Sequence, residues 1–216
     1  MSSNQPPTFD YIRTPDGITE ESFSLIRAEA SLDHMPGIMR AVAERVVHAV
    51  ASVDAADHLR FSEGAAEAAR AALLKGAPIL VDVEMVSRGI TRRFLPGDNE
   101  VICCLSADGV QAQAKARGET RSAIGVEHWG ERLDGAVVVI GNAPTALFRL
   151  LEIILAGGPK PAAILGFPVG FVGAAESKDA LMKHAGDIAF ITLAGRLGGS
   201  PVAAAALNAI ALGENP

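Results

Sequence analysis

The side chains that could carry chemistry in this sequence are one histidine, several arginines and two loops rich in glycine. The loops are Gly-Asn-Ala-Pro-Thr at 141–145 and Gly-Phe-Pro-Val-Gly-Phe-Val-Gly at 166–173, while Arg121 and Arg196 lie near the ends of other predicted elements. Backbone amides and guanidinium groups bind anions, and an imidazole exchanges protons near neutral pH. This pattern favours a site for an anionic small molecule with general acid chemistry, in which His48 is the candidate acid.

Parallel strands must position these loops. Residues 137–140 and 162–165 are apolar runs that lack polar alternation, and a helical pattern of period 3.6 separates them. Strand, helix and strand with short connections predict a right-handed crossover. Further strands are predicted at 78–83, 101–105 and 187–193, with helices between them. We therefore predict a single α/β domain with a doubly wound, mainly parallel five-stranded sheet of flavodoxin-like type, whose ligand lies outside the carboxyl ends of the strands.

Polar and proline residues predict where the helices begin. A first helix is expected from a Thr19 cap to about Ala30, and a second, which carries His48, at 36–50. The other expected starts are Ser62 for an alanine-rich helix, Gln111, Thr120, Ala174, and Ser200 with Pro201. Residues 1–8 are expected to be a disordered extension, which leaves 9–213 as the domain.

Composition excludes several classes of function. The chain has 216 residues and a formal net charge of −6, which argues against nucleic-acid binding. It has no apolar run long enough to span a membrane and no signal-peptide pattern. Cys103 and Cys104 are adjacent, so a disulfide between them is not expected. We expect a cytoplasmic location.

Several nucleotide and metal motifs are missing. The sequence has no Walker motif, no G-x-G-x-x-G fingerprint and no G-x-S-x-G elbow. Asp82 and Glu84 follow the strand at 78–83 and could hold a metal, but no histidine or third carboxylate accompanies them. We therefore expect no metal site there and a strand-end or loop role for these carboxylates.

Taken together, longer segments resemble the precorrin-8X methylmutases of cobalamin biosynthesis, from about residue 9 to residue 212. The segments that carry the resemblance include Arg45-Val46-Val47-His48-Ala49, Asp82-Val83-Glu84-Met85-Val86, Thr120-Arg121-Ser122-Ala123, Gly141-Asn142-Ala143-Pro144-Thr145, Gly166 to Lys178, and Gly195-Arg196-Leu197-Gly198-Gly199-Ser200.

The resemblance implies a homodimeric isomerase that needs no separate cofactor. Such an enzyme moves a methyl group from C11 to C12 of a tetrapyrrole precursor and gives hydrogenobyrinic acid. By position, His48 matches the family's proton donor and acceptor, and Ser22 matches a substrate-binding hydroxyl. The other expected substrate-binding residues are Thr91, Arg121, Asn142, Thr145, Lys178 and Arg196, since guanidinium groups suit the many carboxylates of the substrate.

Three alternatives stay open at this point. The same methyl shift could act on cobalt-precorrin-8. The chain could be a non-catalytic tetrapyrrole carrier, although its histidine argues for turnover. A nucleotide-binding oxidoreductase could use the same fold. For the isomerase we also expect slow product release and a hand-over of the product to the next enzyme of the pathway.

Overall fold

A six-stranded sheet separates two layers of helices in the computed structural model, which describes residues 9–213. The strand order is β1-β6-β5-β4-β2-β3, and only the pairing of β1 with β6 is antiparallel. The strands are β1 (Leu59–Phe61), β2 (Ile79–Val81), β3 (Val101–Cys103), β4 (Val137–Ile140), β5 (Ala163–Gly166) and β6 (Ala189–Leu193).

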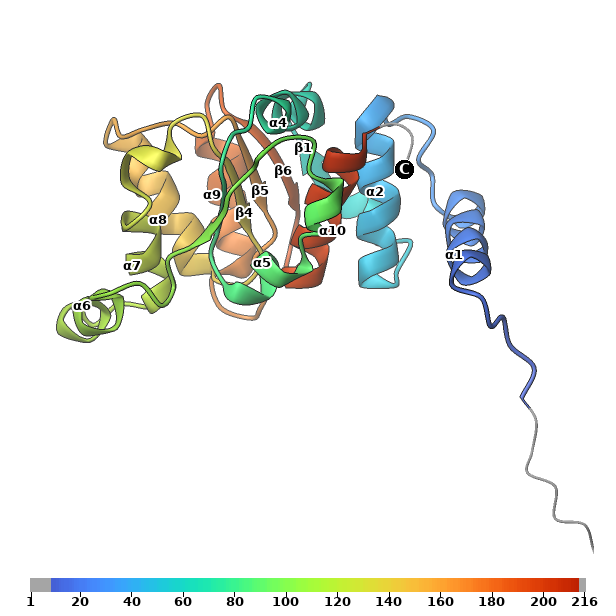
Figure 1. Ribbon diagram of the computed structural model, residues 1–216, viewed down its shortest axis with the longest axis horizontal. Coiled ribbons are helices and arrows are strands. Elements are labelled where there is room, and N and C mark those ends of the chain that lie inside the picture. Colours follow the sequence, from blue (N-terminus) through green and yellow to red (C-terminus); the bar gives the residue numbers. More distant parts are fainter. Residues whose placement is uncertain (1–8, 214–216) are drawn as a thin grey trace, which may run out of the picture.

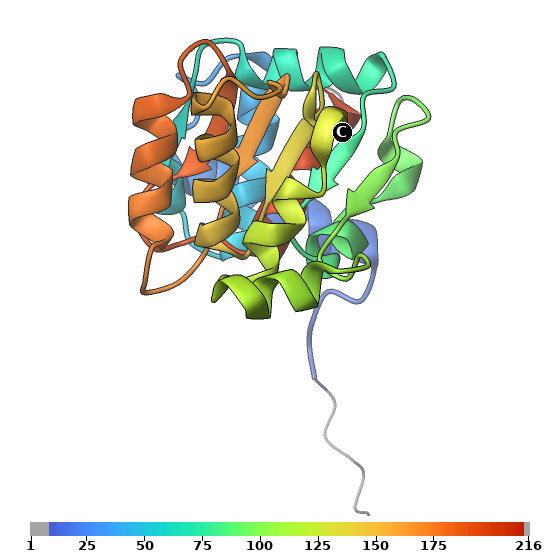
Figure 2. The same cartoon turned by 90° about the vertical axis from the view of Figure 1, so that its left-hand side faces the viewer.

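Helices connect these strands and cover both faces of the sheet (Figures 1 and 2). The α-helices are α1 (Pro15–Glu29), α2 (Gly37–Val50), α3 (Ala55–His58), α4 (Ala65–Leu74), α5 (Glu84–Gly89), α6 (Val110–Arg117), α7 (Arg121–Glu127), α8 (Pro144–Leu155), α9 (Ala174–His184) and α10 (Ser200–Leu212). Two short 3₁₀ helices are η1 (Arg92–Phe94) and η2 (Gly130–Leu133).

Alternate residues of the central strands belong to different cores, as the period of two in a strand requires. Val81, Val139 and Leu165 pack in one cluster with residues of α2, α4 and α10. Leu80 and Val138, one residue earlier, pack in a second cluster with residues of α7, α8 and α9. Both faces are therefore buried, which explains why the strands are apolar throughout.

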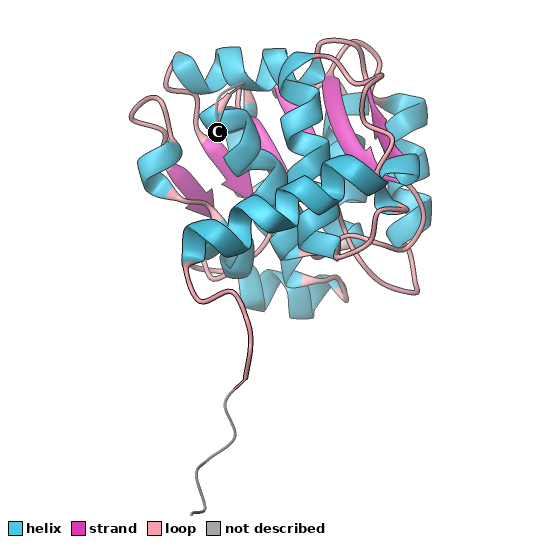
Figure 3. Ribbon diagram, turned by 90° about the vertical axis from the view of Figure 1, so that its right-hand side faces the viewer, coloured by secondary structure: helices cyan, strands magenta, loops and turns pink. Residues whose placement is uncertain are grey.

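The first helices form outer layers on the α10 side of the sheet. In Figure 1, α10 lies next to the sheet, α2 lies outside α10, and α1 lies outside α2; Figure 3 views the molecule from this side. Ile26 is the only buried residue of α1. Most of the surface of α1 is consequently open, including the apolar side chains of Ile18 and Leu25.

The predicted fold class is confirmed, with one strand added. The five parallel strands have the flavodoxin-like order, in which the first strand of the set, β2, lies between β3 and β4. The prediction omitted β1, because this strand has only three residues and includes the exposed Arg60. β1 is an edge strand whose pairing with β6 comes from tertiary contact rather than from a strong local pattern.

Several predicted helix starts were wrong. The first helix begins at Pro15, and the Thr19 hydroxyl donates to the Pro15 carbonyl inside it. Gly64 caps α4, whereas the Ser62 hydroxyl accepts the Phe190 amide of β6. α10 does start at Ser200, but Gly199 and not Ser200 occupies the cap position. The segment between β2 and β3, for which no helix was predicted, contains α5 and η1. In these places tertiary contacts or proline at the first helical turn decided the boundary.

Two further predictions concern the N-terminal residues and membrane-spanning segments. The predicted disordered extension, residues 1–8, lies outside the described residues. Within residues 9–213 no helix is long and apolar enough to cross a membrane.

Candidate active site

Ser22 and His48 line the same hollow, although they belong to different helices. The hollow has a volume of about 490 Å³ and lies between α1 and the last turn of α2. Leu25, Val47 and Val53 give it apolar walls, and Glu29 and Ser52 add polar groups. The Ser22 hydroxyl donates to the Ile18 carbonyl at 2.7 Å, which leaves its oxygen free to accept a bond from a ligand.

The imidazole of His48 is exposed and stacks on an aromatic ring. The ring centroids of His48 and Phe23 are 5.3 Å apart, and the planes differ by 16°. Within residues 9–213 the imidazole makes no hydrogen bond. Its ring nitrogens can therefore meet a ligand that enters the hollow.

The backbone beside His48 has an unusual conformation. Ala51 ends α2 with φ 56° and ψ 37°, and among residues 9–213 it is the only non-glycine residue with positive φ. This left-handed conformation costs an alanine roughly 1–2 kcal/mol. It turns the chain sharply after His48, so that Ser52 and Val53 close one wall of the hollow.

A buried carboxylate organises the loop after β4. Asp82 follows β2, is 3% exposed, and accepts the backbone amides of Gly141, Asn142 and Ala143 at 2.8–3.0 Å. Burial raises the pKa of Asp82, whereas the three amides act in the opposite direction. Both carboxylate oxygens are used for backbone bonds, so the predicted strand-end role of Asp82 is confirmed. It joins β2 to β4 at the point where the strand order reverses, and Asn142 is left exposed on the loop.

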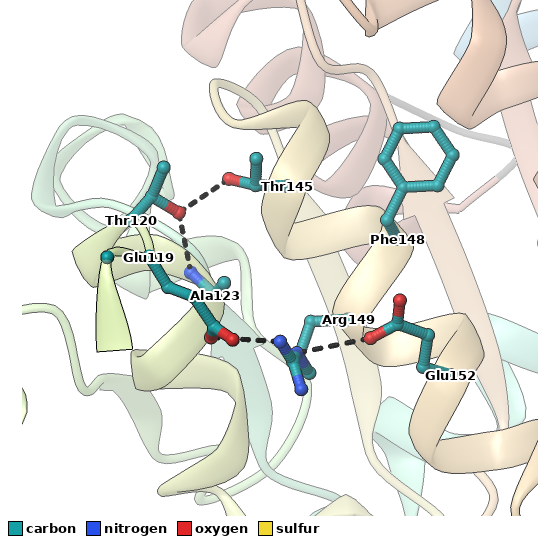
Figure 4. A pocket seen from close by; sticks show the side chains of 8 residues that line it. Glu119, Thr120, Ala123, Thr145, Phe148, Arg149 and Glu152 are labelled. Atoms are coloured by element: carbon teal, nitrogen blue, oxygen red, sulfur yellow. Dashed lines mark hydrogen bonds and ion pairs between the residues drawn. The ribbon is translucent and has the colours of Figure 1, made fainter. Parts of the chain in front are cut away.

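Thr145 lies at the rim of a second hollow, of about 450 Å³, between α7 and α8 (Figure 4). Its hydroxyl is 2.7 Å from that of Thr120, which caps α7 by accepting the Ala123 amide. The guanidinium of Arg149 pairs with Glu119 and Glu152 in the same hollow. The Thr120 cap is as predicted, and the cation of this hollow is already neutralised by carboxylates.

Arg121 and Thr91 lie in other places. Arg121 is exposed at the start of α7 and makes no ion pair with a described carboxylate. It lines a hollow of about 540 Å³ together with Ser106 of the β3–α6 loop and Lys115 of α6. Thr91 is half-buried, and its amide donates to the Asn208 side chain at 2.9 Å. The structure thus leaves the guanidinium of Arg121 available, and it ties the backbone of Thr91 to α10.

The two remaining predicted residues are Arg196, in the loop after β6, and Lys178, in α9. Arg196 is exposed, with its guanidinium carbon 5.3 Å from the ring centre of Phe171. Lys178 is fully buried, and its Nζ donates to the Leu197 carbonyl at 2.6 Å. Arg196 can therefore reach a ligand directly, whereas Lys178 is occupied inside the protein.

Within one chain, the predicted residues fall into separate groups. His48 and Ser22 lie on the layer of α1 and α2, while Arg121 and Thr145 lie on the layer of α7 and α8, with the sheet between them (Figure 1). The loops that carry Asn142 and Arg196 follow the carboxyl ends of β4 and β6. Ser22 and His48 share one hollow, whereas Arg121 and Thr145 line two others.

Comparisons with known proteins show which family this chain belongs to. A sequence profile described as CbiC, precorrin-8X methylmutase, matches residues 17–212. The chain belongs to the precorrin-8X methylmutase family. The precorrin-8X methylmutase of Pseudomonas aeruginosa is 56% identical over 202 residues, which are 94% of this chain and 97% of the relative. The protein of the same name from Sinorhizobium sp. is 55% identical over 205 residues, which are 95% of this chain and 98% of the relative.

A solved structure of the family has the same fold. The precorrin-8X methylmutase of Thermus thermophilus superposes with a TM-score of 0.82 at 41% identity, and the match covers 91% of this chain and 94% of that one. A more distant relative is the cobalt-precorrin-8 methylmutase of Salmonella typhimurium, which is 40% identical over 93% of this chain and 96% of its own length.

Three features of the candidate site could not be predicted from the sequence. Phe23, which stacks on His48, follows Ser22 directly but has no signal of its own beyond helical spacing. The three amide bonds of Asp82 depend on the neighbouring position of β2 and β4. The bond from Lys178 to Leu197 joins α9 to the loop after β6, so only the folded chain reveals it.

Proposed function

We propose that this protein catalyses the isomerisation of precorrin-8X to hydrogenobyrinic acid by moving a methyl group from C11 to C12. The observation that carries the proposal is the shared hollow of Ser22 and His48, in a chain that belongs to the methylmutase family. The reaction rearranges bonds within one molecule. It consumes no oxidant, reductant or second substrate, and the proposal includes no cofactor.

His48 serves in this proposal as the group that lends a proton to the ring and recovers it. Protonation of a ring nitrogen makes the conjugated system more electron-poor, which favours migration of the methyl group. An imidazole suits this task near neutral pH, and general acid catalysis contributes about 10²–10⁴-fold. The ring of Phe23 supports one face of the imidazole, and the Ser22 oxygen can accept a bond from the substrate.

Substrate carboxylates bind to the arginines and exposed polar groups in this proposal. Arg121 and Arg196 are exposed and make no ion pair with described carboxylates. Exposed apolar side chains stand beside Arg196, namely Phe171, Val172 and Leu197. An apolar macrocycle with carboxylates on its rim matches such a mixture of arginine and apolar surface. Asn142, Thr145 and Thr91 are further polar contacts in the proposal, through side chain or backbone.

The metal-free substrate is favoured over cobalt-precorrin-8. Relatives that are named precorrin-8X methylmutase are 55–56% identical to this chain, whereas those named cobalt-precorrin-8 methylmutase include proteins at 36% and 40%. Purified protein should convert precorrin-8X to hydrogenobyrinic acid, as followed by visible absorption, and should turn over cobalt-precorrin-8 more slowly. Binding of precorrin-8X without conversion would instead indicate a carrier.

A homodimer is part of the proposal. Within one chain the candidate residues lie in separate groups, and the first helix and the segment before it carry exposed apolar side chains at Phe9, Tyr11, Ile12, Ile18 and Leu25. A second copy that covers this surface would bury these side chains and could bring another group of polar residues to the His48 hollow.

We also propose a cytoplasmic location. Two unpaired thiols, Cys103 and Cys104, support it, and burial raises the pKa of Cys103 to about 11.

Sedimentation tests the dimer. The wild type should sediment at twice the 22.4 kDa of one chain. Ile18→Glu should dissociate it and reduce turnover, because a carboxylate placed in an apolar interface is desolvated without a partner. Leu74→Glu changes another exposed apolar residue, on α4, and should leave both properties unchanged. A monomeric wild type with full turnover would contradict the dimer.

A further inference from the structure

The loops that follow β5 and β6 are held together as one unit. The Gly199 amide donates to the Phe167 carbonyl at 2.8 Å, and the Gly170 amide donates to the Arg196 carbonyl at 3.3 Å. Gly198 lies so close to the Phe167 and Pro168 carbonyls that a Cβ at this position would collide with both. The two loops therefore meet through their backbones, and neither can move far without the other.

Lys178 supports this unit from inside. It is in the second turn of α9 and is 0% exposed, and its only hydrogen bond in the described structure goes from Nζ to the Leu197 carbonyl. No described carboxylate lies within ion-pair distance of Nζ. Burial lowers the pKa of Lys178 to about 8. A buried lysine without an ion-pair partner is costly, so its position needs a reason beyond packing.

The outer side of the same unit presents the side chains that a ligand would meet. Arg196 precedes the residue that Lys178 holds, and its guanidinium lies over the ring of Phe171. Phe171 and Val172 are 83% and 88% exposed at the tip of the β5–α9 loop. The position of the Arg196 guanidinium thus depends on the backbone that the Lys178 ammonium binds.

We propose that Lys178 is a positioning residue, which fixes the Arg196–Leu197 backbone so that the arginine and the Phe171 tip form one ligand-facing surface. This inference rests on the proposed function, because it assigns Arg196 a carboxylate of the tetrapyrrole. It differs from direct binding by Lys178, which would require the ammonium to leave the Leu197 carbonyl and reach the surface.

A double-mutant cycle on product binding tests the proposal. Lys178→Met, Arg196→Ala and the double variant are titrated with hydrogenobyrinic acid at pH 7, and urea unfolding verifies that each is folded. Lys183→Met is the matched control, since Lys183 is exposed on the same helix. Each single change should weaken binding about tenfold or more, as for the loss of one charge-assisted bond. The control should bind like the wild type.

The double variant decides between positioning and direct contact. If Lys178 acts through Arg196, the double variant binds within about threefold of Arg196→Ala, whereas independent contacts would multiply to about 100-fold or more. Multiplied effects, or a folded Lys178→Met that binds like the wild type, would overturn the proposal. A wild type that fails to bind hydrogenobyrinic acid would instead contradict the proposed function, and this inference with it.

A second variant covers the case in which Lys178→Met does not fold. Gly198→Ala forces the two loops apart from the opposite side and leaves Lys178 in place. A folded Gly198→Ala protein should lose affinity to a similar extent, again without further loss when it is combined with Arg196→Ala. Unchanged affinity in this variant would also overturn the proposal.

Discussion

At the scale of single residues, the candidate side chains differ in whether they are free to contact a ligand. His48 and Arg121 are exposed and make no hydrogen bond or ion pair through their side chains within residues 9–213, so each can meet a ligand. Asp82 and Lys178 are buried and bind backbone groups, so each acts on the shape of a loop. Residue type alone does not reveal this difference, because burial decides which charged groups remain free.

Arg121→Ala should weaken tetrapyrrole binding and cost the free protein little. The arginine is the first residue of α7, where a positive charge opposes the helix dipole, so its removal changes the free energy of unfolding by only a few tenths of a kcal/mol. Loss of a charge-assisted bond to a carboxylate weakens binding roughly 10- to 150-fold. Titration with hydrogenobyrinic acid measures the change, with the exposed Arg132→Ala as control. Unchanged affinity would place Arg121 outside the site.

At the scale of elements, the sequence predicts what local patterns determine. Apolar runs that end in glycine identified β4 and β5, and Thr120 marked the start of α7. The short strand β1 and the start of α4 were missed, because the pairing of Leu59 with Leu193 and the bond from Phe190 to Ser62 join distant segments. The same limit applies to Asp82, whose amide partners are about sixty residues away in the chain.

Asp82→Asn should destabilise the protein, because the side-chain NH₂ group cannot accept a backbone amide. At least one of the amides of Gly141, Asn142 and Ala143 then lacks its acceptor, and an unsatisfied buried donor costs about 1–3 kcal/mol. Urea unfolding at pH 7 measures the loss. Glu84→Gln, two residues later and exposed, is the control and should change stability by less than about 0.5 kcal/mol. Equal stabilities of both variants would refute the organising role of Asp82.

At the scale of the whole molecule, the sheet separates the groups that the proposed chemistry needs together. The layer of α1 and α2 holds Ser22 and His48, whereas the layer of α7 and α8 holds Arg121 and Thr145. Sequence motifs suggested these candidate residues but could not predict this separation, because motifs carry no information about which face of the sheet a helix covers. The proposed dimer is the assembly in which a complete site would form.

Product release should limit turnover. Substrate and product differ in the place of one methyl group and share every peripheral carboxylate, so contacts that bind one bind the other almost equally well. Release then becomes slow, which suits a hand-over to the enzyme that consumes the product. Rapid mixing of enzyme and substrate at comparable concentrations should give a fast burst of about one equivalent per site and a slower steady phase. A progress curve without a burst, together with rapid dissociation of added product, would exclude this.

The proton-transfer role of His48 is the central claim, and turnover by His48→Ala tests it most directly. The variant is purified, its fold and sedimentation are compared with the wild type, and conversion of precorrin-8X is followed by visible absorption. His184→Ala, an exposed histidine at the end of α9, is the control. Loss of the general acid should reduce turnover by about 10²–10⁴-fold, while the control converts substrate at the wild-type rate. A folded His48→Ala protein with wild-type turnover would contradict the claim.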